Sequence, residues 1–299
     1  MAIPLRYSIE SLRARRASML AAAVGIALVV FVLAASRMLS EGIRNTLLSA
    51  GRPERALVLT NTAYAEDDSR LRQSAVALVA AAPGVKRAND GTALVLGEAV
   101  LHVWLASRRD ENRIASVQLR GVTKDVLAVR REVRIVAGRA AKPGTDEAIM
   151  GSALVGRHRG LELGRSFEVK KNRRLAVVGV FSSEGSAYES EIWADLDAVR
   201  SSFGFEGYLS SVTAELESPA RFDAFAAALE RDKRQGLDAT REPAYYEKVS
   251  ENLSSMMSGL GDLVALIVSF GAMLGATITM HGAMTVSYTH LTLPTKRIV

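Results

Sequence analysis

The chain has 299 residues, of which 48% are hydrophobic and 23% charged, and it contains no cysteine. This composition excludes wholesale disorder, disulfide bonds, thiolate metal sites and a cysteine nucleophile, and the length allows about two domains. The net charge of +6 is concentrated at the ends: residues 1–18 carry four arginines against one glutamate, and residues 263–299 carry two basic residues and no acidic one. The nearly neutral middle favours membrane topology over nucleic-acid binding.

The first apolar segment covers residues 19–36 and carries no charge. It is long enough to cross a bilayer as a helix, and Arg13, Arg15 and Arg16 stand directly before it. Because basic residues stay on the inner side of a membrane, these arginines predict a cytoplasmic N-terminus. The alternative is a cleavable signal peptide with a small-residue site at 32–34, but the apolar run exceeds the usual 7–15 residues of such peptides.

The second apolar segment begins at residue 263 and is predicted to span the membrane up to residue 286. Gly271 and Gly275 form a G-x-x-x-G pair on one helix face, which predicts close packing against another helix in lipid. The alternative is a buried helix of a soluble protein. If both segments span the membrane and the N-terminus lies on the inner side, residues 37–262 lie on the outer side.

Apolar residues recur at helical spacing over residues 39–50 and 244–262 and predict two stalk helices flanking the outer domain. Between them, strands are expected at 56–60, 211–216 and 237–240, helices at 68–82 and 219–234, and a hairpin of 94–96 with 100–105 about Gly97. Strand–helix–strand thus occurs on both sides of a central insert. This is the order of a split β-α-β, ferredoxin-like domain, so the fold class predicted is an α+β membrane protein.

The insert, about residues 114–203, has a different pattern. Strands are expected at 114–121, 166–169 and 175–181 with many glycines between them, and short helices at 124–130 and 195–202. Such spacing is typical of a small, mostly β subdomain with tight turns.

No catalytic motif is present. The chain lacks a phosphate-binding G-x-x-x-x-G-K-[ST] loop, a G-x-G-x-x-G turn, a G-x-S-x-G elbow and an H-E-x-x-H pair. We therefore expect no catalytic residue, no cofactor and no metal, and only His102 and His158 are histidines of the outer domain.

The best ligand-like cluster is the acidic run of residues 189–197 around Trp193, which includes Glu189, Glu191, Asp195 and Asp197. A cation site would need several of these oxygens to converge. The favoured interpretation is that they are strand-end and helix-cap residues facing water, and residues 67–69 are likewise interpreted as a cap.

The N-terminal stretch 4–16 places Leu5, Ile9 and Leu12 on one helix face with arginines on the others. This pattern is typical of an interfacial helix on the inner leaflet, in contact with membrane lipid. Contact with a cytoplasmic partner is the alternative.

This order of features resembles the N-terminal half of an ABC-transporter permease of the FtsX-like, MacB-like family. The resemblance begins with IPLRYSIESLRARRASML running into a span and continues in the outer domain with RGVTKDVLAVR at 120–130, VAGRAAKPGTDEAIMGSALVGR at 136–157, GLELGRSFEV at 160–169 and AVVGVFSSEGSAYESEIWADLDAVR at 176–200. It covers the chain to about Ser287.

The resemblance implies a non-catalytic, multi-pass subunit of the bacterial inner membrane with a large periplasmic domain. Such a permease pairs as a homodimer or with a paralogous permease. A separate cytoplasmic ABC ATPase drives it, in some cases with a periplasmic adaptor. The implied function is to couple ATP hydrolysis to export or mechanotransmission at the periplasmic side.

The end of the chain departs from this family. Residues 287–299 lack helical periodicity and the family's cytoplasmic motifs, and they resemble translated sequencing-adapter read-through. We expect this segment to be foreign and the chain to be truncated. Two other functional classes stay open: a membrane-anchored extracytoplasmic sensor or ligand-binding protein, and a secreted hydrolase, which would require signal cleavage and a convergent polar site.

Overall fold

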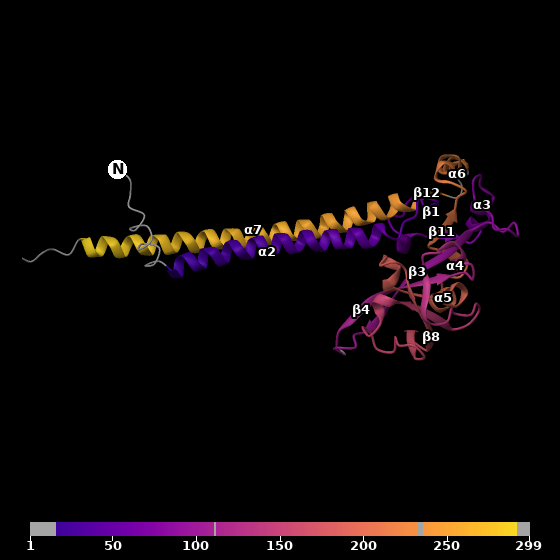
Figure 1. Cartoon of the computed structure of the whole chain (residues 1–299), viewed down its shortest axis with the longest axis horizontal. Coiled ribbons are helices and arrows are strands. Elements are labelled where there is room, and N and C mark those ends of the chain that lie inside the picture. The colour runs from indigo at the N-terminus through magenta and orange to yellow at the C-terminus, as the bar shows by residue number, and fades with distance from the viewer. Residues whose placement is uncertain (1–15, 111, 232–235, 292–299) are drawn as a thin grey trace, which may run out of the picture. The chain divides into compact units, whose positions relative to one another are not determined.

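The structure is a computed structural model that describes residues 16–110, 112–231 and 236–291 (Figure 1). It divides into two compact units. The helical unit contains the chain up to residue 43 and from residue 252, and the α/β unit contains residues 44–251. The predicted interfacial helix at 4–16 and the side chains of Arg13, Arg15 and Arg16 lie outside what is described, although Arg16 begins the first helix.

The helical unit is built from two long helices, α2 (Arg16–Leu48) and α7 (Glu242–Leu291). By length and composition both could cross a membrane, with apolar stretches within Ala23–Leu48 and Glu242–Ile278. The helices approach each other at small residues: a Cβ added to Gly25 would lie 3.0 Å from the Cβ of Ala272. The Ser36 hydroxyl donates to the carbonyl of Met257 (3.1 Å).

The first half of the α/β unit is a four-stranded antiparallel sheet in the order β12-β1-β11-β3. The strands are β1 (Arg55–Thr60), β3 (Val95–Ala106), β11 (Ser211–Glu215) and β12 (Leu237–Arg241). Helix α3 (Ala75–Ala81) follows β1, and the 3₁₀ turn Pro219–Arg221 with α6 (Phe222–Glu230) follows β11. This order is that of a ferredoxin-like domain, and α3 and α6 bury Val79 and Phe225 against the sheet. The predicted α+β class is confirmed.

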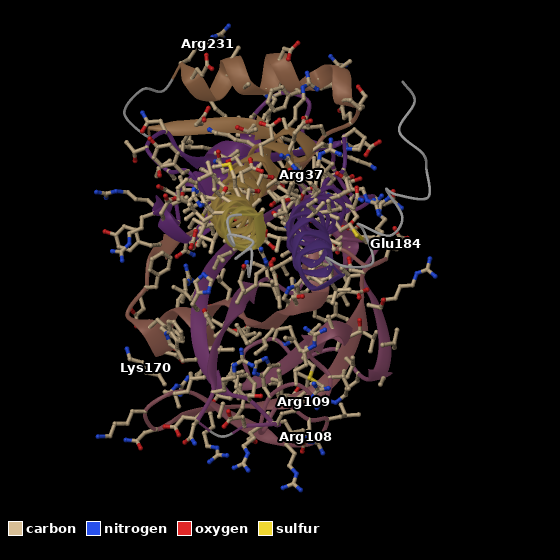
Figure 2. The ribbon with its side chains drawn as sticks, turned by 90° about the vertical axis from the view of Figure 1, so that its left-hand side faces the viewer. Arg37, Arg108, Arg109, Lys170, Glu184 and Arg231 are labelled. Atoms are coloured by element: carbon tan, nitrogen blue, oxygen red, sulfur yellow. The ribbon has the colours of Figure 1, made fainter. Side chains whose placement is uncertain are left out.

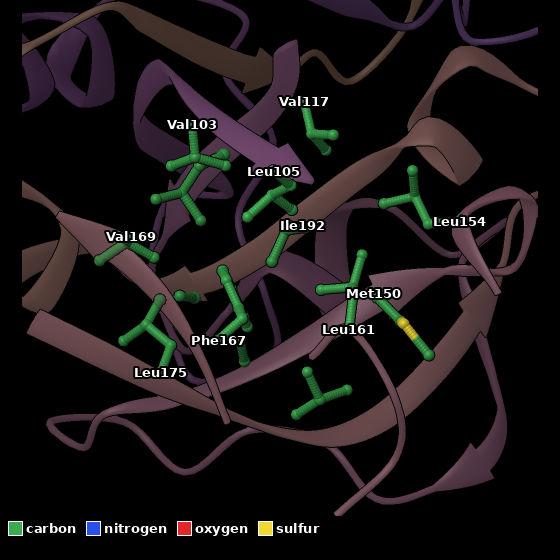
Figure 3. Close-up of a cluster of buried hydrophobic side chains, with 14 of the residues drawn as sticks. Val103, Leu105, Val117, Met150, Leu154, Leu161, Phe167, Val169, Leu175 and Ile192 are labelled. Atoms are coloured by element: carbon green, nitrogen blue, oxygen red, sulfur yellow. The ribbon is translucent and has the colours of Figure 1, made fainter. Parts of the chain in front are cut away.

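The insert continues the same sheet beyond β3 in the order β4-β9-β6-β8-β5, with β7 paired to β8. Its strands are β4 (Ile114–Val122), β5 (Arg134–Gly138), β6 (Glu147–Gly151), β7 (Ser166–Lys170), β8 (Arg173–Ser182) and β9 (Glu191–Asp195). Its helices are α4 (Val126–Val129) and α5 (Leu196–Phe203). Figure 3 shows its core, where Val103 and Leu105 of β3 pack with Val117, Phe167 and Ile192.

Shorter elements complete the unit: the strands β2 (Leu71–Arg72) and β10 (Tyr208–Leu209), and the 3₁₀ turns η1 (Glu66–Asp68), η2 (Ser152–Leu154) and η3 (Ala187–Ser190). The pairing of β2 with β10 corrects one prediction. The helix expected from residue 68 begins only at Ala75, because Leu71 and Arg72 are extended and paired with Leu209 and Tyr208.

The predicted hairpin about Gly97 is wrong. Residues 95–106 form one continuous strand, β3, and its hairpin partner is β4. Gly97 lies mid-strand, where a Cβ would approach side-chain atoms of Val76 and Leu209 to 3.0 Å. Close packing rather than a turn explains this glycine. At the other end of the chain, α7 continues through Leu291, past the predicted loss of helical periodicity at residue 287.

Candidate functional site

The most unusual feature of the α/β unit is a set of buried charged side chains where its two halves and the start of α7 meet. All are 8% exposed or less: Arg55, Glu66, Glu98, Arg120, Arg130, Glu132, Glu191 and Glu242. Removing an ion from water costs several kcal/mol per group, so each of these charges needs a partner. We call these eight residues the root network, because Glu242 is the first residue of α7.

Arg120 on β4 occupies one part of the root network. Its guanidinium donates to both oxygens of Glu66 (2.8 and 3.0 Å) and to both oxygens of Glu191 (2.7 and 2.9 Å). Trp193 Nε1 also donates to Glu191 (2.8 Å), and Ser211 Oγ donates to Glu66 (2.6 Å). Burial raises the pKa of Glu66, but Arg120 and these hydrogen bonds outweigh it, and the pKa is lowered overall.

Arg130, which follows α4, forms a second part. It donates to Glu98 (2.7 Å) and to Glu242 Oε1 (3.0 Å), and it also bonds the hydroxyl of Tyr188. Its guanidinium lies 4.5 Å from the centre of the Tyr188 ring, in cation–π geometry. The Tyr188 hydroxyl also shares a 2.7 Å hydrogen bond with that of Tyr246 on α7. Burial raises the pKa of Tyr188 well above its usual value, so the phenol is neutral.

Arg55 on β1 completes the root network. It donates to both oxygens of Glu132 (2.7 Å each), to the carbonyl of Val129 (2.9 Å) and to Glu242 Oε2 (3.4 Å). The backbone N–H of Arg52 also donates to Glu242 Oε2 (2.9 Å). Glu242 therefore bridges Arg55 of the ferredoxin-like half and Arg130 of the insert.

The first turns of α7 are fixed in the same place by uncharged contacts. The hydroxyl of Tyr245 accepts the backbone N–H of Glu66 (3.1 Å). A Cβ added to Gly51 would lie 2.8 Å from the Cα of Pro243, so only glycine fits this approach. Tyr245 and Tyr246 also pack in a cluster of buried apolar and aromatic side chains around the charges. This apolar shell keeps water away and strengthens each ion pair.

Each of the five carboxylates of the root network lies within ion-pair distance of at least one arginine. The physical property of this network is mechanical: β1, β3, β4, β9, α4 and α7 meet in one set of charge-assisted hydrogen bonds. Displacing α7 relative to either half would break buried ion pairs, at a cost of about 3–5 kcal/mol for each charge left unpaired.

The acidic run around Trp193 is only partly as predicted. Asp195 caps α5, because its Oδ1 accepts the backbone N–H of Asp197 (3.0 Å) and of Ala198 (3.1 Å). Glu191, however, does not face water: it is buried in the root network. Glu189 accepts from Ser182 Oγ and from two backbone N–H groups of its turn, and these hydrogen bonds outweigh burial and lower its pKa to about 2.

The other residues considered from sequence lie elsewhere. His102 is exposed and bonds Ser116, whereas His158 is buried in the insert. Across the described ranges no three His, Asp or Glu side chains are arranged to hold a metal ion. The packing of Gly271 and Gly275 concerns a second chain and stays a prediction, and within this chain α2 meets α7 at Gly25 and Gly261 instead.

Sequence reasoning missed the root network as a whole. Two of its members carried a signal: Glu98 and Arg120 each interrupt an apolar strand, in VLGEAVL and SVQLRGV. A charge at a strand position that faces the core points to a buried partner of opposite sign.

Comparison with known proteins places the chain in a family. A family model described as the MacB-like periplasmic core domain matches residues 17–232. No curated protein matches the chain.

Several solved structures resemble it, and three of them are named here. The periplasmic region of MacB from Actinobacillus actinomycetemcomitans is 12% identical with a TM-score of 0.48, and the match covers 67% of this chain and 94% of that one. The extracellular domain of the ABC-type transporter YknZ from Gram-positive bacteria is 18% identical with a TM-score of 0.47, and the match covers 62% of this chain and 99% of that one. A domain of a putative permease from Porphyromonas gingivalis is 16% identical with a TM-score of 0.41, and the match covers 63% of this chain and 90% of that one. Because the family model matches well over half of its residues, the chain belongs to the MacB-like periplasmic core domain family, that of MacB/FtsX-like permeases of ABC-type transporters.

Proposed function

We propose that this chain is the permease subunit of an ABC transporter and couples ATP hydrolysis by a separate ATPase to export or mechanotransmission at the periplasmic side. The family assignment gives the transporter class. The observation that carries the coupling role is Glu242, which stands at the first position of α7 and bonds both Arg55 and Arg130 in the buried root network.

Helix α7 is continuous from its first residue, Glu242, through the second apolar stretch. The helix runs for 50 residues and contains the second apolar stretch, so a movement imposed on its membrane part is passed along hydrogen-bonded turns to its first residue. At that residue the helix is bonded to β1 and to the end of α4. An ATP-driven movement of α7 would therefore act on both halves of the α/β unit where they meet and displace one half against the other.

The proposal includes the topology and the partners. Residues 19–36 and 263–286 cross the bacterial inner membrane, residues 37–262 lie in the periplasm, and both flanking segments face the cytoplasm, where the ATPase binds. The permease pairs with a second copy or a paralogue through Gly271 and Gly275, and a periplasmic adaptor extends the assembly.

The proposed ATPase partner can be tested by crosslinking in the native membrane followed by affinity purification of the full chain. We expect an ABC ATPase to be recovered with it. Recovery of a signalling enzyme in its place would contradict the proposal and favour the sensor alternative.

Spin labels test the coupling. The chain has no cysteine of its own, so cysteines at the exposed Ser201 of the insert and Asp223 of the ferredoxin-like half form a clean pair of sites. In the complex, we expect ATP to change the distance between the two labels, and Glu242→Gln to abolish the change. A distance that responds to ATP equally in both proteins would contradict a role of Glu242 in transmission.

A further inference from the structure

A hollow of about 790 Å³ lies at the far end of the insert from the root network, between the β3–β4 hairpin tip and the turn at residues 155–158. The two loops hold each other through backbone bonds: Arg108 N–H donates to the carbonyl of Arg157 (2.9 Å), and Arg159 N–H donates to that of Ala106 (3.0 Å). Ser107 and His158 form a β-bridge beside them. The hollow is thus a built concavity of a size typical of ligand sites.

Three arginines line this hollow: Arg109, Arg113 and Arg157. All three are exposed, and none forms an ion pair within the part of the chain that the structure describes. Their neighbour Arg108 differs, because it lies 3.3 Å from Glu162. Figure 2 shows Arg108 and Arg109 at the end of the α/β unit opposite Arg231. These three exposed guanidinium groups, which form no ion pair in the described chain, border one concavity and attract an anion, and their planar donors suit phosphate oxygens.

Apolar side chains border the same hollow. Ile114 is 63% exposed and Val155 is 55% exposed, and both line it. Ile114 lies on the same face of the β3–β4 hairpin as Trp104, which is 71% exposed, since Ile114 pairs with Ala106 and Ser116 with Trp104. Exposed large apolar groups beside cations indicate a ligand that carries both an anionic group and a hydrocarbon part.

We propose that this hollow binds an anionic phospholipid. The guanidinium groups of Arg109, Arg113 and Arg157 contact the phosphate, and Ile114 and Val155 contact the first methylene groups of an acyl chain. The ligand is recognised by the combination of its two parts, so neither inorganic phosphate nor a phospholipid without net charge binds comparably.

Isothermal titration calorimetry on the full chain in an uncharged maltoside detergent tests this. The probes are dihexanoyl phosphatidylglycerol below its micelle concentration, dihexanoyl phosphatidylcholine, glycerol phosphate and inorganic phosphate. We expect saturable binding of the phosphatidylglycerol, weakened by added salt, and at least about tenfold weaker binding of the other three. Equal binding of phosphatidylcholine would overturn the role of the arginines, and equal binding of inorganic phosphate would overturn the lipid assignment.

Variants separate the two parts of the site. Arg109→Gln/Arg113→Gln/Arg157→Gln is expected to weaken phosphatidylglycerol binding at least about tenfold. Ile114→Ser/Val155→Ser is expected to weaken it while leaving the weak phosphate binding unchanged. The control Arg72→Gln/Arg134→Gln/Arg231→Gln removes the same charge from exposed positions outside the hollow and should bind like the unaltered chain. Equal loss in the two arginine triples would mean that net charge alone attracts the lipid, and would overturn the site.

Discussion

Strand β3 connects two regions that use arginine in opposite ways. Near its start, Glu98 belongs to the root network, where Arg120 and Arg130 are 1% exposed and bonded on several sides. Past its end, Arg109 and Arg113 are exposed and without an ion pair in the described chain. An arginine that is buried among carboxylates holds parts of the fold together. An exposed arginine without an ion pair in the described chain is available to bind a ligand. Burial and partner count, rather than residue type, separate the two roles.

The largest expected effect comes from removing one buried cation. Arg130→Ala removes the nearer arginine of both Glu98 (2.7 Å) and Glu242 (3.0 Å) inside an apolar shell and leaves them only Arg120 at 3.5 Å and Arg55 at 3.4 Å, which is expected to lower the free energy of unfolding by about 3–5 kcal/mol. Urea unfolding of the full chain in detergent, followed by near-UV circular dichroism, measures it.

The neighbouring Arg131 is the matched control. Its side chain is 62% exposed and pairs with Glu215, so Arg131→Ala should change the free energy of unfolding by about 1 kcal/mol or less. Similar losses in the two variants would remove the distinction between buried and exposed arginines.

Gly97, the residue before Glu98, is expected to give the next largest effect. A valine there would push into Val76 and Leu209, because even a Cβ approaches their side chains to 3.0 Å. Overpacking of this kind is expected to cost about 1–3 kcal/mol, measured by the same unfolding experiment. Gly91→Ala is not a suitable control, because Gly91 has a positive φ of 85°. The exposed Ser201→Val on α5 is better matched, and an equal loss there would contradict the packing argument.

Much of the fold was predictable from the sequence, whereas the root network was not. The strand–helix–strand order on both sides of the insert predicted the ferredoxin-like half, because hydrophobic periodicity reports local structure. The hairpin predicted about Gly97 was wrong because a glycine required by close packing cannot be told from a glycine required by a turn in the sequence alone. Glu66, Glu191 and Glu242 lie far apart in the chain, and only the fold brings the first two to Arg120 and the third to Arg55 and Arg130. Local patterns can mark a charge inside an apolar strand, as at Glu98 and Arg120, but they do not identify its partner.

Acid is expected to lower the stability of the α/β unit through Glu189, which lies close to Glu191 of the root network in the sequence. The pKa of Glu189, beside Tyr188, is lowered to about 2 by hydrogen bonds from its turn. A lowered pKa contributes stability that is present above the unfolded value of about 4.3 and is lost as the pH falls toward 2. Glu189→Gln should therefore be less stable at pH 7 and lose less stability between pH 4.5 and 2. Urea unfolding of both proteins at pH 4.5 and at pH 2 measures how far the free energy of unfolding falls between these pH values. An equal fall in the unaltered chain and in the variant would contradict the role assigned to Glu189.

The smallest effect is expected at the hollow. Arg109→Gln/Arg113→Gln/Arg157→Gln removes three exposed cations that form no ion pair in the described chain, so no buried group loses a partner. Surface substitutions of this kind usually change the free energy of unfolding by about 0.5 kcal/mol or less, and relief of repulsion between like charges would act toward stabilisation. The variant should therefore unfold like the unaltered chain in low salt while binding phosphatidylglycerol more weakly. A loss of several kcal/mol would show that these arginines support the fold, as those of the root network do, and the contrast along β3 would disappear.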